Sequence, residues 1–184
     1  HGENWRTDPA LSGGGQLYDT GSHLLDALLW TTDSEPDHVS AQIEYAEPRV
    51  DVNSALSIRL RRDGEPITAG VTVSGDGVEV SPSEGYFYWG TEGRASYVED
   101  WITVTEKGAV TYRTEVAEES SFQALNREKL ANFAASIEGT EEPAVPGEVG
   151  LRVTALTEAI YRADETGTRT SVQSVIDEAV AASG

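Results

Sequence analysis

Leucines recur at helical spacing near the start of the chain. Leu17 is followed by Leu24, Leu25, Leu28 and Leu29, and this spacing predicts a helix over residues 16 to about 30 with one apolar face. The glycine-rich stretch 12–15 ahead of it is typical of a turn.

From residue 39 the pattern changes to the alternation of half-buried strands. Tight hairpin turns are expected at Asp63-Gly64 and at Glu106-Lys107-Gly108. Pro48 and the stretch 51–53 are interpreted as a break between the first two strands. The expected strands cover residues 39–45, 55–60, 67–73, 78–80, 86–90, 95–98, 101–105 and 110–115.

Helical spacing returns after residue 122. One helix is expected to stop at Gly139, a second to run from about 149 to Gly167, and a third from Val172 to about 182, capped by Ser171. Consecutive strands without helices between them pair antiparallel. We therefore expect an α+β fold with an open, mostly antiparallel sheet and helices packed on one face, as a single domain over residues 1–184.

The chain is strongly acidic. Its 184 residues hold 13 basic and 32 acidic side chains, which gives a net charge of −19. This charge excludes nucleic acid and anionic membrane surfaces as partners, because both need clustered cations. The acids are spread along the whole chain, so we interpret them as adaptation to the cytoplasm of a salt-loving organism. The alternative is an acidic surface for a cationic partner.

Two absences narrow the possibilities further. There is no cysteine, which excludes disulfides, thiol nucleophiles and cysteine metal sites. The longest apolar run, 24–30, is broken by Asp26 and is far shorter than the roughly 20 residues of a membrane span.

The densest group of chemically useful residues lies at 12–23. Asp19 and His23 are four residues apart and would share one face of a helix. A carboxylate beside an imidazole suits proton transfer to or from a hydroxyl near neutral pH. Spacing alone favours the alternative of an ordinary capped helix with an incidental acid–histidine pair, because such pairs are common. No third ligand stands near enough to favour a metal site.

The wider sequence resembles a known family. Residues 5–9, Trp-Arg-Thr-Asp-Pro, lead into Ser-Gly-Gly-Gly-Gln-Leu-Tyr-Asp-Thr-Gly-Ser-His-Leu-Leu-Asp at 12–26. This stretch resembles the opening of the C-terminal domain of the Gfo/Idh/MocA oxidoreductases, the glucose–fructose oxidoreductase and inositol dehydrogenase family. Gly-Thr-Glu-Gly at 90–93 and the segment 156–167 match in the same order, so the resemblance covers about residues 5–172.

The resemblance implies a dihydrodipicolinate-reductase-like C-terminal domain that closes over an N-terminal Rossmann domain carrying NAD or NADP. By that match His23 is the candidate acid/base and Asp19 orients the substrate or assists the proton relay. Trp5 and Arg6 are expected to line the sugar side of the cleft, with a place for Trp5 in the core left open. The sheet of such domains commonly packs face to face, which implies a homo-oligomer.

Family features of the cofactor half are missing from this chain. No Gly-x-Gly-x-x-Gly follows a strand, and neither Lys107 nor Lys129 stands in a Glu-Lys-Pro stretch. We therefore expect the substrate-binding and oligomerisation domain of an NAD(P)-dependent oxidoreductase acting on a sugar, inositol or related polyol. The chain alone is expected to bind no cofactor and to be inactive. The alternative is a stand-alone, non-catalytic module for oligomerisation or partner binding.

Overall fold

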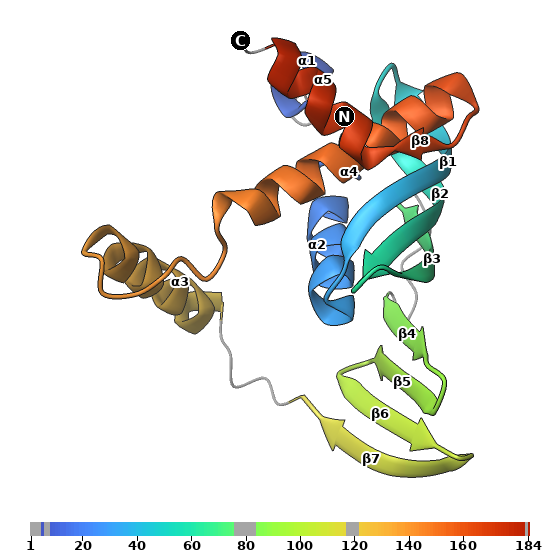
Figure 1. The fold of residues 1–184 in the computed structure, drawn as a ribbon, viewed down its shortest axis with the longest axis vertical. Coiled ribbons are helices and arrows are strands. Elements are labelled where there is room, and N and C mark those ends of the chain that lie inside the picture. The colour runs from blue at the N-terminus through green and yellow to red at the C-terminus, as the bar shows by residue number, and fades with distance from the viewer. Residues whose placement is uncertain (1–4, 6–7, 76–83, 117–121, 183) are drawn as a thin grey trace. The chain divides into compact units, whose positions relative to one another are not determined.

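The computed structural model describes residues 5, 8–75, 84–116, 122–182 and 184 (Figure 1). The chain divides into two compact units. One is formed by residues 1–77 and 145–184, and the other by residues 78–144. The α+β class with open antiparallel sheets is confirmed, but the strands form two four-stranded sheets, one in each unit. The expected strand at 78–80 lies outside the described residues.

The first unit is built on a sheet of strand order β3-β2-β1-β8. Long strands β1 and β2 meet at a two-residue turn, where Arg49 has a positive φ of 64°. The expected break at 51–53 was therefore wrong: these residues belong to β2, and Tyr45 of β1 pairs with Asp51. The strands are β1 (Glu35–Glu47), β2 (Val50–Arg62), β3 (Glu65–Ser74) and the short β8 (Thr170–Ser171).

Helices cover one face of this sheet. The long helix α4 (Gly147–Thr166) packs against β1, and both α2 (Gly21–Thr32) and α5 (Val172–Ala182) contact α4. Alternation along β1 and β2 points one set of side chains at the helices and the other at solvent. The core between them is apolar and includes Leu17, Leu25, Ile58, Leu60, Leu156 and Ile160, all fully buried.

The second unit is an antiparallel meander of strand order β4-β5-β6-β7. The turn at Lys107-Gly108 has positive φ at both residues, as expected for a tight hairpin. Aromatic side chains of this sheet form two ring pairs, Tyr86–Tyr97 and Phe87–Trp89. The elements of this unit are β4 (Gly85–Trp89), β5 (Gly93–Val98), β6 (Trp101–Glu106), β7 (Ala109–Glu115) and α3 (Phe122–Ile137).

Most predicted helices are confirmed, with one exception at the N-terminal side. The hydroxyl of Ser171 accepts a hydrogen bond from the Ser174 amide at 3.4 Å, as expected for the cap of α5. The predicted helix from residue 16, in contrast, begins only at Gly21. A short helix, α1 (Pro9–Ser12), lies within the lead-in. No helix among the described residues is long and apolar enough to cross a membrane.

Candidate functional site

A pocket of about 260 Å³ opens in the first unit, beside the start of β2 and the turn of residues 13–20, called the glycine-rich turn below. Aromatic rings, carboxylates and exposed backbone meet there, a mixture suited to a ligand with hydroxyl groups and an apolar ring face. The lining residues are Trp5, Ser12, Gly14, Gly15, Gln16, Tyr18, Asp19, Val50, Asp51 and Val52.

Asp19 lies in the turn that precedes α2, and not on the helix as predicted. The amide of Gly21 bonds the Gln16 carbonyl, five residues back, at 2.8 Å, which breaks the i to i−4 ladder of a helix at this point. The predicted stacking of Asp19 and His23 on one helical face was therefore wrong. Asp19 lines the pocket, whereas His23 is exposed in the first turn of α2 and is not among the lining residues.

Gly14 and Gly15 are needed because neighbouring atoms lie too close for a side chain. A Cβ at Gly14 would stand 2.3 Å from the Tyr161 hydroxyl, and one at Gly15 would stand 2.3 Å from the Asp51 carbonyl oxygen. Both separations are far inside van der Waals contact. The glycines thus allow the turn to press against β2 and α4.

Asp51 holds the turn from the side of the sheet. Its carboxylate accepts from the amides of Gly15 at 2.9 Å and Leu17 at 2.8 Å. Its own carbonyl accepts from the amide of Gln16 at 3.0 Å. Only 2% of Asp51 is exposed, and a buried carboxylate of this kind is tolerated because donors surround it.

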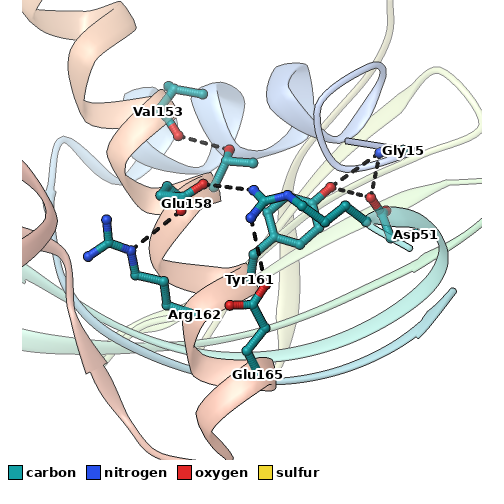
Figure 2. Close-up of polar contacts among 9 residues, drawn as sticks. Gly15, Asp51, Val153, Glu158, Tyr161, Arg162 and Glu165 are labelled. Carbon is teal, nitrogen blue, oxygen red and sulfur yellow. Dashed lines mark hydrogen bonds and ion pairs between the residues drawn. The ribbon is translucent and has the colours of Figure 1, made fainter. Parts of the chain in front are cut away.

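Tyr161 completes this arrangement from α4. Its hydroxyl donates to the Asp51 carboxylate and accepts from the Gly15 amide at 3.3 Å, as Figure 2 shows. Its ring stacks on Tyr18 at 5.7 Å between centroids and on Tyr45 at 6.5 Å. Burial, together with the hydrogen bond to Asp51, raises the pKa of Tyr161 well above its usual value, so the hydroxyl keeps its proton.

Arg49 contacts the Tyr161 ring and is itself paired with acidic residues of α4. The guanidinium carbon of Arg49 lies 4.9 Å from the ring centroid, within the range of a cation–π contact. Arg49 also donates to Glu158 at 3.0 Å and lies 3.6 Å from Glu165 (Figure 2). Glu158, Tyr161 and Glu165 share one face of α4, so the helix itself fixes the Tyr161 orientation.

The two remaining predicted site residues have different outcomes. Trp5 is 56% exposed and lines the pocket, which excludes the alternative that it is a core residue. Arg6 lies outside the described residues. His38, the next histidine along the chain, is partly exposed on β1 with its Nδ1 2.6 Å from the carboxylate of Asp37.

Sequence reasoning missed Asp51 and Tyr161. One signal was present: Asp51 is a carboxylate between Val50 and Val52, and an acid flanked by strand-forming residues demands a buried partner or a turn. The partner comes from a segment 110 residues away, which no local pattern reveals.

The glycine-rich turn does not fit a dinucleotide. A pyrophosphate needs free backbone amides at the start of a helix, but the amides of Gly15, Gln16 and Leu17 are all taken by Asp51. Among the residues that the structure describes, no three metal-ligating side chains gather at one point. What the pocket offers is the polar residues Gln16 and Asp19 and aromatic surface.

Comparisons with known proteins place the chain. Residues 1–96, a little more than half of the chain, match the model of the GFO/IDH/MocA C-terminal domain. Against the curated proteins the chain has no significant match.

Several solved structures share the fold. Aldose–aldose oxidoreductase from Caulobacter crescentus, solved with glycerol, is 24% identical with a TM-score of 0.72, over 92% of this chain and 51% of that one. An NAD-binding protein from Listeria innocua is 28% identical with a TM-score of 0.64, over 92% and 51%. Levoglucosan dehydrogenase, solved with NADH and levoglucosan, is 16% identical with a TM-score of 0.72, over 91% and 53%.

This chain spans about half the length of each of these structures. Its own residues supply the matching fold and the pocket beside the glycine-rich turn. By the match of residues 1–96, the chain belongs to the GFO/IDH/MocA C-terminal domain family.

Proposed function

We propose that this chain is the substrate-binding and oligomerisation half of an NAD(P)-dependent oxidoreductase that acts on a sugar, an inositol or a related polyol. The observation that carries the proposal is the pocket in which Trp5, Gln16 and Asp19 meet. Carboxylate and amide groups bind hydroxyls, and an exposed aromatic ring covers the apolar face of a sugar.

The similar structures support the same substrate class. One was solved with glycerol and another with NADH and levoglucosan, so polyol and sugar ligands both occur in proteins of this fold. Because Asp51 holds the amides of Gly15, Gln16 and Leu17, which a pyrophosphate would need, the proposal assigns NAD or NADP to a part of the intact protein outside this chain. It assigns to this chain only binding and proton transfer.

In this proposal His23 is the acid/base and Asp19 orients the substrate hydroxyl. Asp19 lines the pocket and precedes α2, while His23 is solvent-exposed in the first turn of that helix, four residues further on. Histidine is the side chain that most often serves as a general acid or base. The two residues thus divide the work: the carboxylate binds, and the imidazole carries the proton.

The test is His23→Ala in the full-length enzyme. Loss of a general acid/base lowers turnover by about 10²- to 10⁴-fold, while affinity for the nicotinamide cofactor, followed by fluorescence titration, is expected to stay unchanged. His38→Ala is the matched control, because His38 pairs with Asp37 on β1 and does not line the pocket. Turnover that is equal in the two variants would remove His23 from the mechanism.

The proposal extends to the working environment. The net charge of −19 and its even spread support a protein of a salt-loving cytoplasm, since dissolved salt screens repulsion between like charges. Homo-oligomerisation is proposed through the solvent-facing side of the β3-β2-β1 sheet, where Ser40, Ser57 and Gly70 form a row of small residues.

A further inference from the structure

Four hydrogen bonds to the glycine-rich turn and to Tyr161 converge on Asp51. Three come from turn amides, and the fourth comes from the Tyr161 hydroxyl to the Asp51 carboxylate. Each backbone amide from Gly15 to Leu17 therefore donates to Asp51, a residue outside the turn. The position of the turn is therefore set by β2 and α4, and not by local backbone preference alone.

Asp19 is attached directly to the part that Asp51 holds. The Asp19 amide donates to the Gly15 carbonyl at 3.1 Å, and the Gly15 amide donates to both Asp51 and Tyr161. A displacement of Gly15 thus moves the residue whose carboxylate lines the pocket. The path from Tyr161 to Asp19 runs through two hydrogen-bonded contacts.

We propose that Asp51 and Tyr161 are positioning residues that hold the glycine-rich turn and thereby set where the Asp19 carboxylate stands in the pocket. The role given to Asp19 rests on the proposed function. The holding of the turn by Asp51 and Tyr161 does not, and it is tested separately below.

The surroundings of Tyr161 suit this role. The side chain is fully buried, stacked on Tyr18 and covered by Arg49, so its ring has little freedom to turn. Its hydroxyl also bonds both partners of the Gly15–Asp51 hydrogen bond, because it donates to the Asp51 carboxylate and accepts from the Gly15 amide (Figure 2). A group locked in this way transmits its position to the turn.

The test compares Tyr161→Phe with Tyr45→Phe. Tyr45 is a matched control because its ring belongs to the same stack. Its hydroxyl also donates to a carboxylate in a partly buried hydrogen bond, that of Asp164 at 3.0 Å. Each substitution removes one hydroxyl and keeps the ring. Only Tyr161→Phe removes a contact to the turn.

Two measurements decide the proposal. On this chain, NMR follows amide hydrogen exchange at Gly15 and Leu17 and the carbon chemical shift of the Asp19 carboxyl. We expect faster exchange and a changed Asp19 carboxyl shift in Tyr161→Phe, with neither change in Tyr45→Phe. In the full-length enzyme we expect kcat to fall about 10- to 100-fold for Tyr161→Phe alone, since small misplacements cost about that much.

The outcomes separate the positioning role from the proposed function. Equal kcat in the two variants, or an unchanged amide exchange and an unchanged Asp19 carboxyl shift in Tyr161→Phe, would overturn the positioning role. A full-length protein that oxidises no polyol with either nicotinamide would overturn the proposed function, and the NMR comparison would then decide the positioning role by itself.

Discussion

At the scale of single residues, two glycines are required because a side chain at either position would clash with its neighbours. Gly14 and Gly15 sit where the Tyr161 hydroxyl and the Asp51 backbone come closer than any Cβ permits. Gly13 is different, because its φ of 81° lies in the left-handed region and closes α1. One glycine is required by its backbone angle and two by their neighbours.

Gly15→Ala is expected to destabilise the chain. The new methyl group would meet the Asp51 backbone, which cannot move without disturbing the β1–β2 pairing, so the free energy of unfolding should fall by about 1 to 3 kcal/mol or more. Gly150→Ala is the control, since Gly150 lies on α4 with open space around it and alanine favours helix by about 1 kcal/mol.

Urea unfolding followed by circular dichroism measures both variants. Gly15→Ala should shift the midpoint down and Gly150→Ala should shift it slightly up. A midpoint for Gly15→Ala at or above that of the wild type would show that the turn has room that the structure does not give it.

At the scale of elements, a side chain of α4 accepts a hydrogen bond from the unpaired edge of β1. The short β8 pairs only with His38 and Val39 of β1. Further along that strand, the amide of Ile43 donates to the Asp164 carboxylate of α4 at 2.8 Å, and the Tyr45 hydroxyl donates to the same carboxylate. Asp164 thus binds α4 to the sheet and satisfies an edge amide.

The middle of the opposite face of this sheet carries small residues. Ser40, Ser57 and Gly70 form one exposed cross-strand row, beside Ala55 and Thr72. Longer side chains, those of Gln42 and Arg59, lie on the same face. The small residues leave room for a second sheet to approach, which supports the proposed homo-oligomer.

Ser57→Arg is expected to separate the oligomer. An arginine in the middle strand places a long charged side chain in the centre of the proposed interface, so sedimentation velocity of the full-length protein should show a smaller species than the wild type. Thr154→Arg, at an exposed position of α4, adds the same side chain elsewhere and should leave the sedimentation coefficient unchanged. A wild type that already sediments as a monomer would contradict the interface.

At the scale of the whole molecule, the acidic side chains far outnumber the basic side chains that could pair with them. Arginines do find acidic partners, for example Arg61 with Asp37 at 2.8 Å and Arg162 with Glu158 at 3.4 Å. Even full pairing of all 13 basic side chains would leave a net charge of −19. Repulsion of this kind disfavours the compact state and is screened by salt.

The thermal midpoint should therefore rise as KCl increases from about 0.1 to 1 M, where the Debye length falls from about 10 to 3 Å. Glu92→Gln with Glu106→Gln removes two exposed charges and lowers the net charge from −19 to −17. This double variant should gain less from salt than the wild type does. A midpoint that is flat or falls with KCl would reject the salt-adapted interpretation.

Local patterns were reliable where the cause is local. The turn at Asp63-Gly64 was predictable because both residues accept positive φ angles, and α5 was predictable from its apolar spacing and the Ser171 cap. The start of α2 was not, because leucine spacing continues through a turn whose amides are captured by a distant carboxylate. Asp19 and Trp5, which the sequence singled out, line the pocket, whereas the sequence did not single out Asp51 and Tyr161.

The sequence by itself determined the strands and helices in outline, the acidic character and the family resemblance, since each depends on neighbouring residues or on composition. Only the tertiary structure decided the division into two sheets and the contact of Asp51 with Tyr161, 110 residues apart. The physical reason is that a buried carboxylate needs donors from wherever the fold brings them. The hydrogen bond of Gly15 to Tyr161, 146 residues later in the chain, likewise exists only in the folded structure.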